Sequence, residues 1–325
     1  MQNLVTVFGG SGFIGTQVVR QLAKAGWRIR VAVRNPNLGY AMRLHGDVGQ
    51  IDVIQANIRN EASVRRAVEG ATAVVNLVGV LFEQGRQGFQ AVHVMGARNV
   101  AEAARDAGVT QLIQMSALGA DINSPSKYAR SKAEAEAAVR DAFPGAVIVR
   151  PSVVFGQDDG FFNKFAQMAA LSPVLPLIGG GRTRFQPVFV GDVAKAIARM
   201  TTDPAAAGET YELGGPADFS FRRLMEIVLE ETGRRRMLLP IPFGAAGALG
   251  AVGDIVAMVL PPPITSDQLE LLKTDNVVSG AYLGLADLGV TPTTLESVLP
   301  TYLYRYRRGG QYADQEARAV AGGQA

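Results

Sequence analysis

The chain has 325 residues, 48% of them hydrophobic, and its 32 basic and 29 acidic residues give a formal charge of +3. The length fits one large α/β domain or a nucleotide-binding domain with a smaller companion, and the scattered basic residues do not form the stripe of a nucleic-acid-binding protein. Absent cysteine excludes disulfides and thiolate nucleophiles, and two histidines, His45 and His93, argue against a zinc site, so we predict no metal.

In the first half, apolar runs rich in β-branched residues alternate with segments of helical period, which is typical of a parallel sheet covered on both faces. Strands are predicted at 4–8, 29–33, 52–55, 73–77, 111–115 and 147–149. Helices are predicted at 14–25, 61–68, 89–107 and 126–142. This order predicts an α/β fold with a Rossmann-type doubly wound parallel sheet. Because the first strand begins at once, leaving no room for a secretory signal, we expect a protein of the cytoplasmic side.

A glycine-rich turn follows the first predicted strand. It reads Gly9, Gly10, Ser11, Gly12, Phe13, Ile14 and Gly15, and it satisfies both GxxGxxG and GxGxxG. Glycine permits a tight turn, close approach of a pyrophosphate and close packing of helix on strand, and the amides and dipole of the helix N-terminus attract phosphate. We predict that residues 9–15 bind a nicotinamide dinucleotide; the alternative is a glycine-rich turn without a ligand.

The end of the second predicted strand indicates which dinucleotide is bound. An NAD-selective site usually carries Asp or Glu here, because a carboxylate accepts hydrogen bonds from the ribose hydroxyls. This strand ends in Arg34, and a guanidinium at this place pairs with a 2′-phosphate. Arg34 therefore favours NADP(H) over NAD(H); a solvated loop arginine is the alternative.

Tyr128 and Lys132 form a YxxxK pair within the fourth predicted helix. The four-residue spacing places phenol and ammonium on one helical face. A phenol beside a fixed positive charge is a better acid or base for the alkoxide formed in hydride transfer, and the ammonium can hydrogen-bond a nicotinamide ribose. We take both residues as candidates for catalysis and cofactor binding.

After about residue 151 proline and glycine become frequent and strands shorten. We predict a dinucleotide-binding domain over 1–155, to which the chain returns over 185–215, a smaller substrate or partner lobe over 156–308 with helices at 221–232 and 266–273, and a mobile tail over 309–325. The apolar stretch 243–260 is interrupted by Asp254 and four glycines and closed by three prolines, so a membrane-spanning helix is not expected.

Two features of the second lobe leave alternatives open. Three arginines at 234–236 precede glycines at 244, 247, 250 and 253, which predicts either a helix packed within the lobe or an interfacial helix on an anionic membrane surface. Tyr302, Tyr304 and Tyr306 alternate with other residues. This alternation predicts an edge segment with aromatic packing or an interface strap.

Together these segments resemble the extended or atypical short-chain dehydrogenases/reductases over roughly residues 1–300. Residues 57–58 stand where that family usually has Asp with an apolar neighbour that contacts adenine, 76–79 resemble its loop beside the cofactor, 150–156 its RPxxxxG strand and turn, and 188–194 its HVxDVA-like segment. The resemblance implies further cofactor contacts at Asn57, Ile58, Val78, Gly79 and Pro151.

One departure from that family concerns catalysis. The family's catalytic Ser or Thr follows the fifth strand, where our alignment places Ala117, with Ser116 one residue earlier. Because adjacent strand residues point to opposite faces, this register lacks the polarising hydroxyl and argues against turnover. A register shifted by one residue makes Ser116 complete a triad with Tyr128 and Lys132, so Ser116 is either catalytic or a vestige of a catalytic residue.

Several segments resemble a narrower group, the nucleotide-binding accessory subunits of respiratory complex I, the NADH:ubiquinone oxidoreductase. They are 115–120, 126–136, 141–144, 151–159, 162–165 and, above all, 265–268, 271–273 and 275–278. This resemblance implies a non-catalytic subunit that holds NADPH permanently and has a structural or assembly role. It implies partner subunits near the quinone site and a peripheral place on the cytoplasmic face of the inner membrane. The alternatives are a free-standing NADP(H)-dependent oxidoreductase, epimerase or dehydratase, and a cofactor-sensing regulator.

Overall fold

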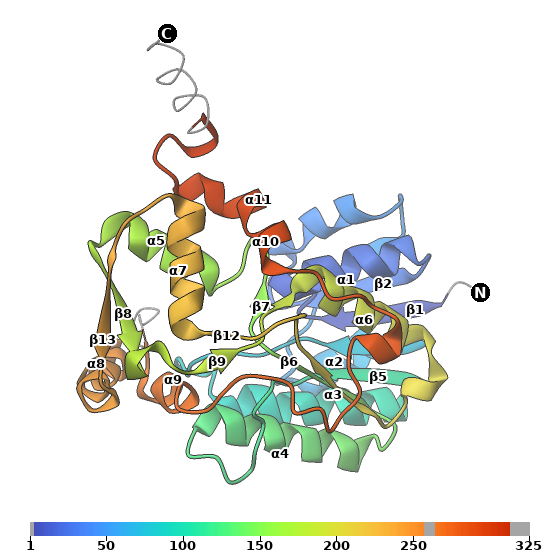
Figure 1. The fold of residues 1–325 in the computed structure, drawn as a ribbon. Helices are drawn as coiled ribbons and strands as arrows, with labels where there is room; N and C mark the ends of the chain where they lie inside the picture. Colours follow the sequence, from blue (N-terminus) through green and yellow to red (C-terminus); the bar gives the residue numbers. More distant parts are fainter. Residues whose placement is uncertain (1–2, 257–263, 313–325) are drawn as a thin grey trace.

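The computed structural model describes residues 3–256 and 264–312, and a seven-stranded sheet lies at its centre (Figure 1). The strand order is β11-β6-β5-β4-β1-β2-β3, and every neighbouring pair is parallel. The strands are β1 (Leu4–Phe8), β2 (Arg28–Val33), β3 (Ile51–Gln55), β4 (Ala73–Asn76), β5 (Gln111–Met115), β6 (Val147–Pro151) and β11 (Thr210–Leu213). This arrangement confirms the predicted Rossmann-type α/β fold.

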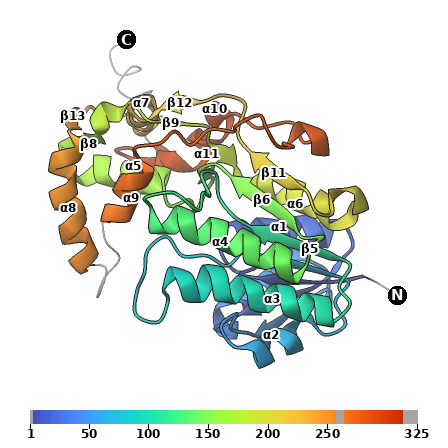
Figure 2. The same ribbon diagram turned by 90° about the horizontal axis from the view of Figure 1, so that it is seen from below.

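Helices cover both faces of this sheet, as Figure 2 shows from below. One face carries α1 (Phe13–Lys24) and α6 (Val190–Thr202), and the other carries α2 (Glu61–Val68), α3 (Met95–Asp106) and α4 (Lys127–Ala142). Alternate strand residues supply the two cores: Val5 and Val7 belong to the first and Phe8 to the second. The predicted helix at 89–107 begins as a π-helical turn, Gln90–Val94.

The second lobe is built from short elements. Its strands are β7 (Val154–Phe155), β8 (Val174–Ile178), β9 (Arg184–Phe185), β10 (Val188–Phe189), β12 (Phe219–Ser220) and β13 (Met237–Ile241). Its helices are α5 (Phe162–Leu171), α7 (Phe221–Thr232), α8 (Phe243–Val256), α9 (Ser266–Leu271), α10 (Leu295–Val298) and α11 (Pro300–Leu303). Short 3-10 turns occur in both parts of the chain. They lie at Pro36–Leu38, Tyr40–His45, Gly179–Gly181, Pro204–Ala206, Ala286–Leu288, Tyr304–Tyr306 and Gly310–Tyr312. A third core of aromatic and aliphatic side chains, including Phe155, Phe162 and Phe221, fills this lobe.

The tyrosine-rich segment corrects one prediction. Residues 300–306 form α11 and a 3-10 turn, not an extended edge segment. Pro300 occupies the first helical turn, and the Tyr302 hydroxyl donates to the buried Asp159 carboxylate (2.5 Å), so tertiary packing overrides the alternating pattern. Of the predicted tail, Gly310–Tyr312 forms a turn, and residues 313–325 lie outside the described part of the chain.

The glycines of α8 divide between packed and open positions. A Cβ on Gly253 would lie 1.7 Å from the Ile264 carbonyl oxygen, and one on Gly250 would lie 2.7 Å from Leu269, so both glycines pack against the start of α9. Gly244 and Gly247 have open space on their Cβ sides. Two of the four α8 glycines, Gly250 and Gly253, therefore pack within the lobe. Within residues 3–256 and 264–312, no helix combines the length and apolarity needed to cross a membrane.

Candidate functional site

The turn between β1 and α1 needs glycine for two different physical reasons. Gly9 has a φ of +76°, a left-handed conformation that side chains rarely adopt. A Cβ on Gly15 would lie 2.2 Å from the Gly9 carbonyl oxygen, so only glycine lets the helix pack directly against the turn. Gly12 precedes α1 as its N-cap. The first amides of α1 have no partner within the helix and are available to a phosphate.

A cavity of about 290 Å³ opens beside this turn at the carboxyl ends of β1, β2, β3 and β4. Its lining includes the predicted cofactor residues Gly9, Ser11, Gly12, Arg34, Asn57, Ile58, Val78 and Gly79. The other predicted cofactor residues lie outside that lining: Gly10, Phe13, Ile14, Gly15, Tyr128, Lys132 and Pro151. Because the chain leaves β1 toward β2 on one side and β4 on the other, this is the switch point at which doubly wound sheets bind ligands. The glycine amides, apolar walls and cationic rim fit the adenosine half of a dinucleotide.

The rim of the cavity carries two guanidinium groups. Arg34 follows β2, and its Nη1 donates to Gln87 Oε1 (2.6 Å). Arg59 was missed by sequence reasoning; its Nη1 donates to the Arg86 carbonyl oxygen (2.7 Å). The available signal was its place two residues after Asn57 at the end of β3. Both arginines therefore bring positive charge to the cavity where β2 and β3 end.

The structure places Tyr128 and Lys132 together on the first turns of α4. The Lys132 Nζ lies 5.7 Å from the Tyr128 ring centroid, and a Cβ on Gly79 would lie 3.3 Å from the same ammonium. Burial raises the pKa of Tyr128 to about 12, and burial lowers the pKa of Lys132 to about 8 against the opposing effect of Glu136. At neutral pH the phenol is thus a proton-bearing hydrogen-bond donor.

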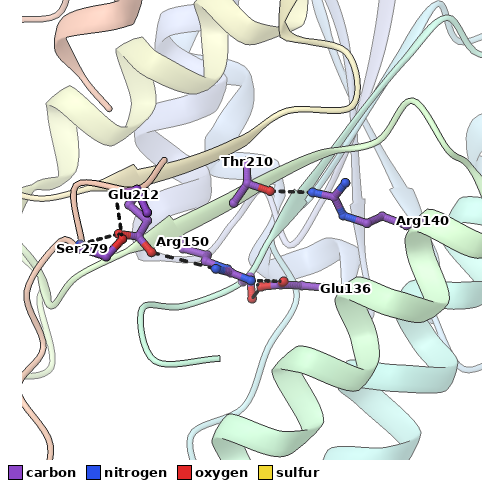
Figure 3. A network of polar contacts seen from close by, with 8 residues as sticks. Glu136, Arg140, Arg150, Thr210, Glu212 and Ser279 are labelled. Carbon is purple, nitrogen blue, oxygen red and sulfur yellow. Dashed lines mark hydrogen bonds and ion pairs between the residues drawn. The ribbon is translucent and has the colours of Figure 1, made fainter. Parts of the chain in front are cut away.

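Ser116 contacts a different group. Its buried hydroxyl donates to Glu136 Oε1 (2.5 Å), two helical turns beyond Tyr128 on α4. The same carboxylate accepts hydrogen bonds from Nε and Nη2 of Arg150 (2.9 and 2.6 Å). Nη1 of Arg150 also forms an ion pair with Glu212 Oε1 on β11 (3.9 Å; Figure 3). The Ser116 hydroxyl therefore belongs to a buried ionic network, and its catalytic role stays a prediction.

The C-terminal signature segments hold the second lobe to this site. The Asp267 carboxylate accepts hydrogen bonds from the backbone N–H groups of Lys127 (2.5 Å) and Tyr128 (3.0 Å) and from the Ser126 hydroxyl (3.0 Å). A carboxylate at a helix N-terminus satisfies its amides and favours its dipole. Asn276 likewise accepts from Ser152 Oγ and the Val153 N–H after β6. Sequence reasoning noticed both segments without a role for either.

Comparisons with known proteins agree with this geometry. The model of the NAD dependent epimerase/dehydratase family matches residues 5–214. A relative from Arabidopsis thaliana, NADH dehydrogenase (ubiquinone) 1 alpha subcomplex subunit 9, mitochondrial, is 37% identical over 94% of this chain and 79% of its own length. A ceramide reductase from Caulobacter vibrioides is 31% identical over 86% of this chain and 87% of its own.

Among solved structures, an NADPH-dependent quinone oxidoreductase from Escherichia coli, complexed with NADPH, has a TM-score of 0.72 at 23% identity, over 92% of this chain and 98% of that one. That likeness concerns the fold. The family match and the relatives above 30% identity confirm both resemblances inferred from the sequence. The chain belongs to the NAD dependent epimerase/dehydratase family.

Proposed function

We propose that this protein is an accessory subunit of respiratory complex I that binds NADP(H) and has a structural or assembly role without turnover of its own. The observation that carries the proposal is the 37% identity to a mitochondrial NADH dehydrogenase subunit over 94% of the chain. That length includes the second lobe, where Asp267 and Asn276 join it to the dinucleotide-binding sheet. We place the subunit peripherally on the cytoplasmic face of the inner membrane, beside subunits near the quinone site.

Residues of the cavity have distinct roles in cofactor binding under this proposal. The amides of residues 9–15 hold the pyrophosphate, Asn57 and Ile58 contact adenine, and Arg34 with Arg59 pairs with the 2′-phosphate. Tyr128 and Lys132 hold the nicotinamide ribose. NADP(H) supplies a hydride donor or acceptor when bound. Two guanidinium groups at the ribose end favour NADP(H) over NAD(H).

The absence of turnover is inferred from the fifth strand and the tyrosine. Ser116 is engaged by Glu136, and the next residue is Ala117, which has no hydroxyl. The raised pKa of Tyr128 also makes its phenol a weaker acid toward a forming alkoxide. A second candidate function, an NADP(H)-dependent reductase, is supported by the Tyr128–Lys132 pair and by the 31% identity to a ceramide reductase.

Gentle purification from the native membrane, followed by identification of released nucleotide and copurifying proteins, tests the proposal. We expect stoichiometric NADPH together with complex I subunits, because a permanently held ligand stabilises the fold and survives purification. A partner-free protein with exchangeable nucleotide would contradict this function. In that case ketone reduction that is lost in Tyr128→Phe would establish the reductase.

Cofactor selectivity gives a separate prediction. Arg34→Ala is expected to weaken NADPH binding about tenfold or more while leaving NADH binding within about twofold, because only NADPH carries the phosphate with which a guanidinium pairs. Titration of the nucleotide-free protein by calorimetry measures both affinities. The matched control is Arg28→Ala, at the opposite and exposed end of β2. Equal losses for the two nucleotides would remove Arg34 from the 2′-phosphate site.

A further inference from the structure

His93 lies in the π-helical turn Gln90–Val94 that leads into α3, and it is 2% exposed. A π turn inserts an extra residue into the helical repeat and is frequent at functional sites. The ring stacks on Phe89 at a centroid distance of 5.3 Å and meets the Tyr128 ring edge-on at 5.5 Å. His93 is therefore packed directly against one member of the Tyr128–Lys132 pair.

Both ring nitrogens of His93 make hydrogen bonds. Nε2 accepts from the Val80 N–H (3.0 Å), and Nδ1 lies 2.9 Å from Ser131 Oγ. Because Nε2 is an acceptor, the proton resides on Nδ1 and is donated to Ser131 Oγ. The Ser131 hydroxyl in turn donates to the Tyr128 carbonyl oxygen (2.8 Å). One imidazole thus links residues 78–80, which follow β4, to the first turns of α4.

His93 and Lys132 lie against the same glycine. A Cβ on Gly79 would lie 3.5 Å from His93 Nε2 and 3.3 Å from Lys132 Nζ. Burial and the nearby Lys132 charge lower the pKa of His93 to about 3, so the ring is neutral beside the ammonium. A protonated imidazole would lose the Val80 hydrogen bond and repel Lys132. The contacts and the charge agree on a neutral ring with its proton on Nδ1.

The strand order of the sheet indicates which half of a dinucleotide would lie beside His93, Gly79 and Lys132. Arg34 and Arg59 follow β2 and β3 on one side of β1, whereas Gly79 follows β4 on the other side and Lys132 is on the helix after β5. A dinucleotide with its pyrophosphate on the turn after β1 and its 2′-phosphate at Arg34 directs its nicotinamide half toward Gly79.

We propose that His93 is a positioning residue that holds residues 78–80 and the Tyr128–Lys132 pair at the separation required by the nicotinamide half of the cofactor. The inference rests on the proposed function for the identity of the ligand. Its physical core is the bridge itself: one uncharged ring joins the Val80 N–H to Ser131 and, through the Ser131 hydroxyl, to the Tyr128 carbonyl oxygen. His93 itself is assigned no contact with the reacting atoms.

The test compares two ligands on the full-length, nucleotide-free protein. NADPH spans the whole site, whereas 2′,5′-ADP has the phosphorylated adenosine half without nicotinamide. We expect His93→Ala to weaken NADPH binding about tenfold and to leave 2′,5′-ADP binding within about twofold of wild type. His45→Gln is the matched control, because His45 is the other histidine of the chain and is bonded to Arg20 away from this cavity.

Two conservative variants test the two hydrogen bonds of His93 separately. His93→Gln can retain an acceptor for the Val80 N–H, and His93→Asn can retain a donor for Ser131, so each is expected to weaken NADPH less than His93→Ala. The same ligand comparison can be made with these two variants if His93→Ala fails to fold. Equal weakening of both ligands in the folded variants, or unchanged NADPH affinity, would overturn the proposal.

A ligand-free measurement separates this inference from the proposed function. Hydrogen exchange of the Val80 amide is expected to accelerate in His93→Ala and His93→Asn and to remain slow in His93→Gln. Unchanged exchange in His93→Ala would show that the bridge does not exist. If the wild-type protein binds neither ligand, the proposed function fails, and the exchange rates still decide the role of His93.

Discussion

Replacing Gly15 by alanine is expected to abolish dinucleotide binding and to destabilise the whole chain. The added Cβ would lie 2.2 Å from the Gly9 carbonyl oxygen and 2.6 Å from the Gly10 Cα. These are backbone atoms of the turn and have no rotamer into which they can retreat. The helix must therefore move off the strand, at a cost of about 3 kcal/mol. The loss should be visible both in urea unfolding and in nucleotide titration.

Two other glycines separate the stability effect from the binding effect. A Cβ on Gly12 would meet only the Gly9 carbonyl oxygen, at 3.3 Å, on the wall of the cavity. Gly12→Ala should therefore fold nearly as well as wild type yet bind NADPH much more weakly. Gly244→Ala, on an open side of α8, should leave both properties near wild type. A normally folded, nucleotide-binding Gly15→Ala would show that the turn does not have the packing described here.

The second large effect is expected at Arg150. Arg150→Met removes the bidentate partner of Glu136, a residue that is 6% exposed and whose carboxylate would retain only the Ser116 hydroxyl as a hydrogen-bond donor. An uncompensated buried charge lowers the free energy of unfolding by about 3–5 kcal/mol. The double variant with Glu136→Met should be less destabilised than the sum of the single variants, because Glu136 is then not left buried without its cation, while Glu212 loses Arg150 in the single and the double variant alike.

An exposed ion pair between the same two residue types is the control for Arg150. Arg98 and Glu102 lie 2.8 Å apart on α3, with side chains 50% and 33% exposed. Arg98→Met should leave the free energy of unfolding close to that of the wild type, because solvent screens the pair. Urea unfolding of the four variants gives the comparison. Similar losses at Arg98 and Arg150 would mean that burial does not set the strength of the Glu136–Arg150 pair.

The sequence predicts those parts of the structure that depend on residues close together in the chain. The apolar run rich in β-branched residues predicted the strand at 4–8, and the glycine spacing predicted the phosphate turn, because both patterns act over a few residues. Arg59 and His93 became part of the site only through folding. Tyr302 was misjudged for the same reason, since its partner Asp159 is 143 residues away in the chain.

The Asp267 carboxylate has a thermodynamic consequence for binding at two separate parts of the chain. It joins α9 to the backbone of Tyr128 at the cofactor site, and Asp254 of α8 in turn accepts the Ser266 N–H (3.1 Å). Free-energy coupling between two binding events is reciprocal. If a bound nucleotide orders α4, this hydrogen-bonded chain couples it to α9 and α8, and a ligand of those helices would then change nucleotide affinity by the same factor by which the nucleotide changes the affinity for that ligand.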